Sequence, residues 1–291
     1  MNQDKEKEPQ TINKPLRNWR FRFIKNIIMP FSFIIVILFA WEAYGVVFGE
    51  NRLLPPPSRI INAFVETREL LFFHAKYTLI EAAMGFLLAF LVSVFLALLI
   101  DHFKLLKQAI YPLLVISQTV PIVAIAPLFI VLFGFGILPK VIVVALMCFF
   151  PIVISMVEGL QAADKDMVDL LRVMDASNWQ IFRLVRFPAA LVSIFSGIKI
   201  AAAYSVMGAV IGEWVGARYG LGLFMILVQK SFRTDQMLAA IAVITAASLL
   251  LFGAMELLQR LLMPWYYSKG DGEDIFVDQK RERKVVNEEE G

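Results

Sequence analysis

Cysteine, histidine and charge are scarce in this 291-residue chain, which has one cysteine, two histidines and 18% charged residues. The lone Cys148 cannot form a disulfide within the chain, and inside an apolar run it is expected to be a small buried hydrophobe. His74 and His102 flank one apolar segment, so they do not meet in a metal site. The chain also lacks the G-x-x-x-x-G-K-[ST] loop that binds nucleotide phosphates. We therefore expect no metal, no cofactor, no nucleic-acid partner and no enzyme activity.

Apolar residues dominate the sequence instead. They make up 59% of the chain, and the mean hydropathy is +0.69, which is too high for an ordinary soluble domain. A transmembrane helix needs about 20 mostly apolar residues, and uncharged runs of this kind recur along the sequence. We predict an all-α, polytopic protein of the lipid bilayer with six transmembrane helices, at about residues 26–47, 77–100, 108–133, 138–157, 189–212 and 236–261.

Two stretches depart from simple spans. The third predicted span contains Pro112, Pro121 and Pro127, and such helix breakers are tolerated where neighbouring helices or water satisfy the freed backbone groups. After the prolines that follow the first span, residues 58–73 are amphipathic. We expect them to form a separate short helix along the outer membrane surface.

The distribution of Lys and Arg predicts the orientation. With the N-terminus inside the cell, the inside segments hold 19 of the 28 Lys and Arg residues and the outside segments hold 8. Because cytoplasmic loops are enriched in these residues, both termini are expected in the cytoplasm of a multi-pass protein of the cell (plasma or inner) membrane. The chain then divides into a cytoplasmic segment 1–25, a transmembrane domain 26–264 and a cytoplasmic tail 265–291.

The loop 158–188 is the longest polar interruption between the spans, and this orientation places it in the cytoplasm. Its first part shows apolar residues at the i, i+3, i+4 and i+7 spacing of one helix face, namely Met167, Leu170, Leu171 and Met174. Asp164 is well placed to cap the N-terminus of this helix.

A second short helix is predicted from Ser177. Gln180 follows three residues later, in the S-x-x-Q pattern of a capping box. Trp179, Phe182 and Val185 then give the helix an apolar stripe. A solvated connector does not need aromatic residues on a capped helix, so we interpret the stripe as a surface that docks into another protein. The alternative is an interfacial helix that rests on the membrane surface.

This loop and the span after it resemble the permease subunits of ABC importers. The strings ASNWQIFRLVRFPAAL (176–191) and IFSGIKIAAAYSVMGAVIGEW (194–214) are similar to the nitrate/sulfonate/taurine branch of that family. The likeness extends through most of the chain from Leu79 onward. In the family's cytoplasmic loop, E-A-A-x3-G-x9-I-x-L-P, the E-A-A positions fall on residues 169–171, the Gly on Asp175 and the Pro on Pro188. Of these positions only Pro188 is identical.

The resemblance implies a type I ABC importer permease fold and a set of partners. These are a cytoplasmic ATPase subunit that binds the ATP, an extracytoplasmic solute-binding protein and a second permease, expected to be another copy of this chain. The loop 158–188 would couple the ATPase to transport. The residues expected to take part in this coupling are Asp169, Asp175, Ala176, Ser177, Trp179, Gln180, Phe182, Arg183 and Pro188.

Asp175 departs from the family's glycine. Glycine adopts the left-handed conformation that ends many helices without steric cost, whereas aspartate visits it less readily. We therefore expect the turn between the two loop helices to be more strained than in the family, or differently shaped.

Polar residues inside the spans are the candidates for a solute path. The strings SQTVPIVAIAPLFIVLFGFGILPKVIVVALMCFFPIV and YSVMGAVIGEWVG resemble permeases for the pyrimidine precursor of thiamine. An aminopyrimidine ring can stack on an aromatic side chain and accept or donate hydrogen bonds. Each of these residues can equally serve as hydrogen-bonding glue between helices. The predicted path residues are Gln118, Thr119, Tyr204, Ser205, Glu213 and Trp214.

Lys199 is the only basic residue predicted inside a span and away from its ends. Its side chain either snorkels to the cytoplasmic interface or pairs with another helix. Since an anion site would need positive charge on the path, import of nitrate, a sulfonate or taurine is the alternative to a thiamine-pyrimidine-like heterocycle. The fifth span also carries small residues, expected to pack against a second copy: Gly197, Ala201–Ala203, Gly208 and Ala209.

A self-sufficient secondary transporter or channel is the competing functional class. It needs an ion-coupling carboxylate in mid-span, but Glu42, Glu81 and Glu213 all lie near the outer ends of their predicted spans. It would also leave the capped helix at 177–186 without a partner. A membrane enzyme has no supporting residues.

Overall fold

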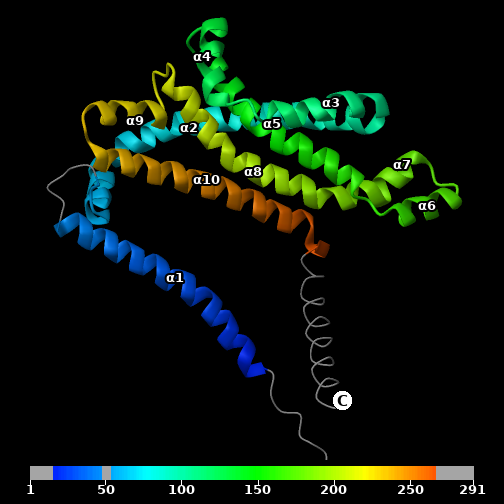
Figure 1. Ribbon diagram of the computed structural model, residues 1–291, viewed down its shortest axis with the longest axis horizontal. Coiled ribbons are helices and arrows are strands. Elements are labelled where there is room, and N and C mark those ends of the chain that lie inside the picture. The colour runs from blue at the N-terminus through cyan, green and yellow to red at the C-terminus, as the bar shows by residue number, and fades with distance from the viewer. Residues whose placement is uncertain (1–15, 48–53, 267–291) are drawn as a thin grey trace, which may run out of the picture.

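The computed structural model describes residues 16–47 and 54–266, so most of the predicted segments 1–25 and 265–291 lie outside the described residues (Figure 1). Every regular element in these two ranges is a helix, which confirms the all-α class. The elements are, in order, α1 (Leu16–Val47), α2 (Pro57–His102), α3 (Lys104–Ser117), α4 (Ile122–Phe133), α5 (Ile137–Gln161), α6 (Lys165–Val173), α7 (Asn178–Ile181), the π-helix η1 (Phe182–Arg186), α8 (Phe187–Trp214), α9 (Leu221–Lys230) and α10 (Thr234–Leu262).

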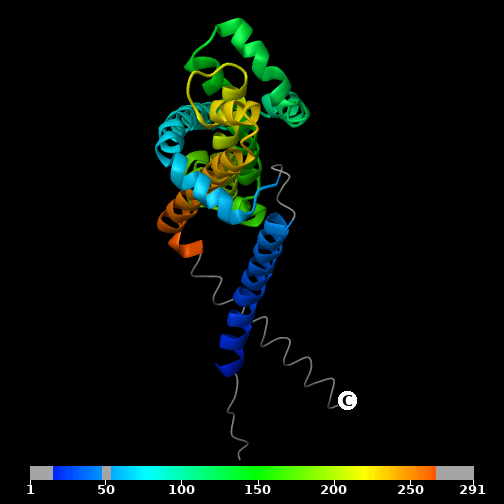
Figure 2. The same ribbon diagram turned by 90° about the vertical axis from the view of Figure 1, so that its left-hand side faces the viewer.

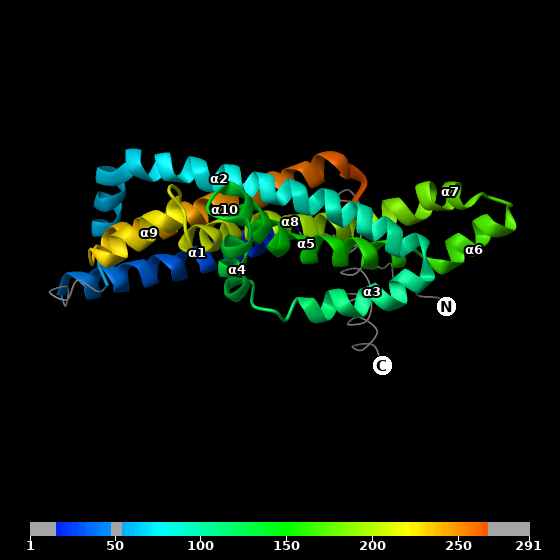
Figure 3. The ribbon, with the colours of Figure 1, turned by 90° about the horizontal axis from the view of Figure 1, so that it is seen from above.

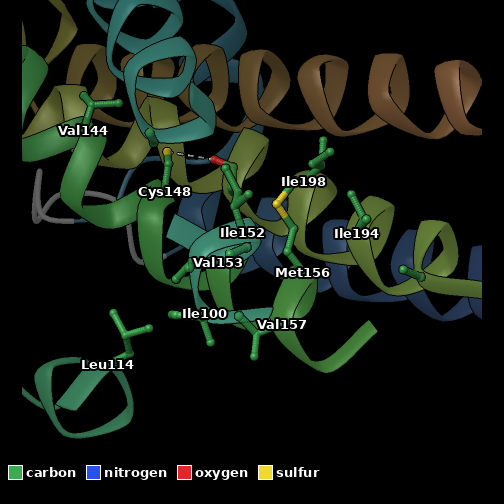
Figure 4. Packing of buried hydrophobic residues seen from close by; sticks show 14 of the residues in the cluster. Ile100, Leu114, Val144, Cys148, Ile152, Val153, Met156, Val157, Ile194 and Ile198 are labelled. Atoms are coloured by element: carbon green, nitrogen blue, oxygen red, sulfur yellow. Dashed lines mark hydrogen bonds between the residues drawn. The ribbon is translucent and has the colours of Figure 1, made fainter. Parts of the chain in front are cut away.

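Four long helices, α2, α5, α8 and α10, form the bundle that carries the core (Figures 1 and 2). α5 packs against α8 and α2, and α10 packs against α8 and α2. The core side chains of α5 include Val144, Cys148 and Ile152, which are fully buried (Figure 4). The thiol of Cys148 donates a hydrogen bond of 3.2 Å to the carbonyl of Ala201 on α8. Cys148 therefore has the structural role that the sequence predicts.

The small residues of α8 pack inside the chain, not against a second copy as predicted. A Cβ added at Gly197 would lie 2.5 Å from the carbonyl oxygen of Pro151 on α5. A Cβ added at Gly208 would lie 3.0 Å from the Cα of Val144, also on α5. Glycine at these positions lets the two helix backbones approach closely. The small-residue stripe is thus explained by the α5–α8 contact.

Four helices of the described chain are long and apolar enough to cross a membrane: α2, α5, α10 and the continuous helix Asn178–Trp214 that comprises α7, η1 and α8. The bent pair α3–α4 offers a fifth crossing. The first predicted span coincides with α1, in which the apolar described part, Ser32–Val47, is shorter than a full crossing. All six predicted segments are helical, but length and composition support up to five crossings among the described residues.

The third predicted span, residues 108–133, which contains three prolines, is not one helix. The structure breaks this segment into α3 and α4, whose axes differ by 100°. Pro121 precedes α4 as its N-cap residue, and it lacks the N–H group that a continuing helix requires. In the turn before Pro121 a backbone hydrogen bond is still made, because the Thr119 N–H donates to the Ile116 carbonyl at 3.0 Å. Sequence hydropathy marks the apolar segment but does not show this change of direction.

The prediction of a separate surface helix over residues 58–73 is wrong. α2 runs continuously over 46 residues from Pro57 to His102, and Figure 3 shows its first turns bending away from the longer part. Near its N-terminus, Ser58 donates to the Glu42 carboxylate of α1 from its N–H at 2.9 Å and from its hydroxyl at 2.6 Å. The first N–H groups of a helix have no partner within the helix, so Glu42 stabilises this end of α2. The remainder of α1 diverges from the bundle (Figures 1 and 2).

Candidate functional site: the coupling segment

We call residues 158–188 the coupling segment. Its first helix, α6, begins after Asp164, whose side chain accepts a hydrogen bond of 2.9 Å from the Asp166 N–H, as predicted for an N-cap. The apolar side chains on α6 stay uncovered within the described chain: Met167 is 51% exposed, Leu170 56% and Met174 69%. The predicted helix face exists; Leu171 is half-buried, and the other three residues stay exposed within this protomer's described residues.

The turn after α6 forms around Asp175, which has a φ of 58° and so adopts the left-handed conformation. The Ala176 N–H donates to the Leu171 carbonyl and the Asp175 N–H donates to the Arg172 carbonyl, both at 3.0 Å. This pair of bonds is the Schellman pattern that usually contains glycine at the left-handed position. The turn therefore keeps the glycine geometry with an aspartate in it, which disagrees with the alternative of a differently shaped turn; the greater strain stays a prediction.

The predicted capping box of the second helix is present. The Gln180 N–H donates to the Ser177 hydroxyl at 3.3 Å, and the Ser177 N–H donates to the Gln180 side-chain oxygen at 2.7 Å. These two bonds fix the start of α7. Both residues lie at the surface, so the box is a local feature that the sequence alone could predict.

The sequence predicts that the second loop helix ends before the next span begins. In the structure it does not end there. α7 continues through the π-helix η1 into α8, and Pro188 lies in the first turn of α8. The Phe187 N–H donates to the Phe182 carbonyl, five residues earlier. Proline lacks an N–H group, so a wider turn before Pro188 keeps the helix continuous. Any displacement of α7 is therefore applied to one end of the span α8.

Two aromatic rings mark the outer side of this helix. The rings of Trp179 and Phe182 stack with centroids 5.6 Å apart and an interplanar angle of 18°. Trp179 is 68% exposed, whereas Phe182 is half-buried. Figures 1 and 3 show α6 and α7 projecting past the end of the bundle. An exposed indole held rigid by a ring stack is typical of a protein–protein contact.

The other predicted coupling residues lie on α6, in the turn after it and on η1. Asp169 and Arg172 form an exposed ion pair of 3.1 Å along α6. Arg183 is exposed on η1, and Ala176 is partly buried in the turn. Arg186, which no sequence motif singles out, contacts Asp101 of α2 and the Leu160 carbonyl of α5. The opposite charges of Arg186 and Asp101, each next to the end of a predicted span, were the available signal in the sequence.

A buried polar cluster closes the opposite end of the bundle. Lys140 of α5 forms an ion pair with Glu81 of α2, and both side chains are at most 10% exposed. Glu213 of α8 accepts hydrogen bonds from the Thr78 hydroxyl at 2.7 Å and from the Gly222 N–H at 2.6 Å. No group of three His, Cys, Asp or Glu residues in the described ranges has the arrangement of a metal site.

This cluster also holds the N-terminus of α9. Thr78 accepts a hydrogen bond of 2.9 Å from the Leu221 N–H, and His74 accepts one of 3.0 Å from the Gly220 N–H. The N–H groups at a helix start need such external partners. Gly220 has a φ of 125°, and an added Cβ there would overlap the Glu213 carboxylate. Glu213 is thus engaged in hydrogen bonds inside the protomer, and its role on the solute path stays a prediction.

The predicted path residues of α8 fall on two different faces. Tyr204 and Trp214 are 43% and 45% exposed, and they share one open face with Ile200 and Met207. Ser205 is buried and donates to the Ala202 carbonyl of its own helix at 2.7 Å. This open face is the exposed side of a helix whose other sides are mostly buried. Of the four residues, only Tyr204 and Trp214 are accessible.

The remaining path residues, Gln118 and Thr119, lie exposed in the break between α3 and α4. The Thr119 hydroxyl donates to the Ile116 carbonyl at 2.8 Å, so it is used by the local backbone. Their roles in solute binding stay predictions. The break itself places polar groups at the point where the apolar segment changes direction.

Lys199 takes the second of its two predicted alternatives. Its ammonium group lies 2.7 Å from the Glu256 carboxylate of α10, and Glu256 also pairs with Arg260 at 3.2 Å. The side chains of Lys199 and Glu256 are 18% and 26% exposed. The lysine therefore joins α8 to α10, and its charge is not directed at the open face of α8.

Comparison with known proteins relates this arrangement to transport permeases. Residues 89–266 match the model of the family described as binding-protein-dependent transport system inner membrane component. The formylaminopyrimidine transport permease protein ThiX of Halalkalibacterium halodurans is 35% identical over 81% of this chain and 95% of its own length. The riboflavin transport system permease protein RibX of Chloroflexus aurantiacus is 34% identical over 81% and 89%.

More distant similarities cover sulfonate permeases and a solved structure. The putative aliphatic sulfonates transport permease protein SsuC of Bacillus subtilis is 29% identical over 88% of this chain and 92% of its own length. A crystal structure of an amino acid ABC transporter with histidines has a TM-score of 0.54 and 17% sequence identity, and it covers 68% of this chain and 95% of that one. This structural likeness concerns the fold alone.

Proposed function

The chain belongs to the family of binding-protein-dependent transport system inner membrane components, and we propose that a separate cytoplasmic ATPase drives it through the coupling segment. The observation that carries this proposal is the continuity of α7 with α8. An exposed, capped and aromatic helix end is joined without a break to a span of the bundle. A partner that moves Trp179 and Phe182 therefore acts on α8 directly.

The mechanism follows from this connection. The chain lacks a nucleotide phosphate loop, so ATP is bound by the partner. Closure of the ATPase dimer displaces α7, and α8 transmits the displacement towards the buried cluster around Glu213. A change in the packing of α8 against α5 and α2 then alternates the access of the path between the two sides of the membrane. The helices remain packed units during this movement because protein interiors are close-packed.

The open face of α8 supports a second permease in the same complex. Ile200, Tyr204, Met207 and Trp214 are each 43–46% exposed on a helix whose other faces are largely buried. A second copy of this chain, placed against or opposite this face, would enclose a path between the two protomers. In this arrangement both termini and the coupling segment lie in the cytoplasm, and the solute-binding protein delivers solute at the Trp214 end.

The solute we propose is a thiamine-pyrimidine-like heterocycle. Tyr204 and Trp214 offer aromatic surfaces on which a planar ring can stack. The cationic side chains of Lys140 and Lys199 are neutralised by Glu81 and Glu256, which disfavours an anion at these positions. The relatives at 34–35% identity carry heterocycles in their names, formylaminopyrimidine and riboflavin. A sulfonate, nitrate or taurine is the alternative, favoured by the resemblance to SsuC.

Reconstitution separates this function from a self-sufficient secondary transporter. The chain is placed in liposomes alone, or together with the ATPase and binding protein of its own transport system, and uptake of radiolabelled formylaminopyrimidine is measured. We expect uptake only with the ATPase, the binding protein and ATP. Flux through the chain alone would contradict the proposal and favour the secondary transporter.

Growth distinguishes the two solute classes in cells. A thiamine auxotroph that requires the pyrimidine precursor is grown on a limiting amount of it, with and without the gene for this chain. We expect growth to depend on the gene. If deletion spared this growth but abolished use of a sulfonate as the sulfur source, the heterocycle would be the wrong solute while the permease function would stand.

A further inference from the structure

Arg186, the last residue of η1, joins three helices at the cytoplasmic end of the bundle. Its guanidinium donates to both carboxylate oxygens of Asp101 on α2, with N···O distances of 3.1 and 2.5 Å. The same guanidinium donates to the carbonyl oxygen of Leu160 on α5 at 3.0 Å. The Arg186 and Asp101 side chains are 28% and 15% exposed, so water competes only partly with these bonds.

The two acceptors have few other ways to be satisfied. Leu160 lies in the last turn of α5, where carbonyl groups lack a partner within the helix. Asp101 lies in the last turn of α2, where the helix dipole disfavours a negative charge. Local helix stability therefore does not explain a carboxylate at this position. The bidentate bond to Arg186, which only a planar guanidinium makes, does explain it.

The position of Arg186 along the coupling segment lets these bonds hold the helix at η1 when α7 is displaced. Arg186 stands between the exposed ring of Trp179 and the span α8, at the end of the π-helix. A π-turn inside a helix frequently occurs at a functional site, and it interrupts the regular hydrogen-bond pattern at this point. Without a brace, a push on α7 can bend the helix at η1 before it reaches the bundle. The bonds of Arg186 hold this point against α2 and α5.

We propose that Arg186 is a positioning residue that makes α2 and α5 move together with α8 when the ATPase displaces the coupling segment. The proposal rests on the proposed coupling function and adds which helices receive the displacement. Asp101 and the Leu160 carbonyl are the two points of transmission. Arg186 contacts neither solute nor nucleotide in this account.

Hydrogen exchange in the assembled complex tests the proposal. The chain is purified with its ATPase and binding protein, and backbone exchange is compared with and without ATP plus vanadate. In the wild type we expect ATP-dependent changes at the cytoplasmic ends of α2 and α5 and at the start of α8. In Arg186→Ala, the change at α8 persists and the changes at α2 and α5 are lost. Asp101→Asn, which preserves side-chain shape, loses the change at α2.

Further variants separate positioning from folding. Arg186→Lys keeps the charge but cannot make the bidentate bond, so we expect a partial response at α2. Lys107→Ala is the matched control, because it removes a cation at the same end of the bundle that forms no ion pair within the described chain. Its ATP response should equal that of the wild type. Equal responses of all three helices in Arg186→Ala and Asp101→Asn would overturn the proposal. A wild type with no response in α8 would overturn the proposed function itself.

Discussion

Glu213 of α8 accepts a hydrogen bond of 2.7 Å from Thr78 of α2, a residue 135 positions earlier in the sequence. The same carboxylate accepts the Gly222 N–H, and Thr78 accepts the Leu221 N–H. Three helices, α2, α8 and α9, therefore meet through two side chains that have almost no contact with solvent. This junction fixes the end of the bundle opposite the coupling segment.

Loss of the Thr78 hydroxyl should destabilise the fold. Thr78→Val keeps the side-chain shape but leaves the Glu213 carboxylate and the Leu221 N–H each short of a partner. An unsatisfied buried polar group costs about 1–3 kcal/mol, and thermal unfolding of the protein in detergent measures the loss. Thr245→Val is the control, since the exposed Thr245 donates only to the Ile241 carbonyl of its own helix. Equal unfolding temperatures of the two variants would contradict the assigned role of Thr78.

The buried Lys140–Glu81 pair should show strong coupling between its two members. Lys140→Met leaves an uncompensated carboxylate between α2 and α5, at a cost of about 3–5 kcal/mol. The double variant Lys140→Met/Glu81→Leu removes both charges and should recover most of that loss. A double-mutant cycle measured by thermal unfolding gives the interaction energy. If the two single losses simply added, the pair would not be the buried contact described here.

Unlike the substitutions above, replacement of Asp175 by glycine should stabilise the protein. Because its φ of 58° lies in the left-handed region, Asp175→Gly should relieve strain and stabilise the turn by about 1 kcal/mol. Asp175→Val should destabilise it, since β-branched residues fit this region poorly. Hydrogen exchange of residues 165–176 reports the local stability. Faster exchange in the glycine variant would show that the Asp175 side chain contributes more than the backbone strain costs.

Loss of the capping box should lower the local stability of α7. Ser177→Ala removes the acceptor for the Gln180 N–H and should cost about 1 kcal/mol, whereas Ser177→Asp retains an acceptor and should be nearly neutral. Exchange of the amides in 178–182 should be faster in the alanine variant alone. Unchanged exchange in Ser177→Ala would mean that packing against the bundle holds α7 without the cap.

Features set by neighbouring residues could be predicted from the sequence. The Asp164 cap, the Ser177–Gln180 box and the left-handed turn at Asp175 depend on side chains within three or four positions, and the structure contains all of them. The membrane-spanning helices were also predictable, because hydropathy over a long window is a local property.

Features set by tertiary contacts could not be predicted in this way. The 100° break at Pro121 depends on packing, because prolines at 112 and 127 lie inside helices that continue. The partners of Arg186, Lys140 and Glu213 lie on other helices. A single sequence shows that such residues are unusual in an apolar chain, but not which of them meet. For this reason the sequence does not predict that Glu213 joins α2, α8 and α9.

The most direct test of the central claim is ATPase binding by the variant Trp179→Asp/Phe182→Asp. The two rings stack on the helix that continues into α8. Trp179 is 68% exposed, whereas Phe182 is partly buried against the core, so the single variant Trp179→Asp is measured beside the double variant to remove the exposed apolar contact without touching the core. We expect both variants to reach the membrane, to lose copurification of the ATPase and to lose ATP-dependent uptake. Phe232→Asp, at an 81% exposed position near the opposite end of the bundle, should retain the ATPase. Copurification and uptake at wild-type levels in Trp179→Asp/Phe182→Asp would contradict the account.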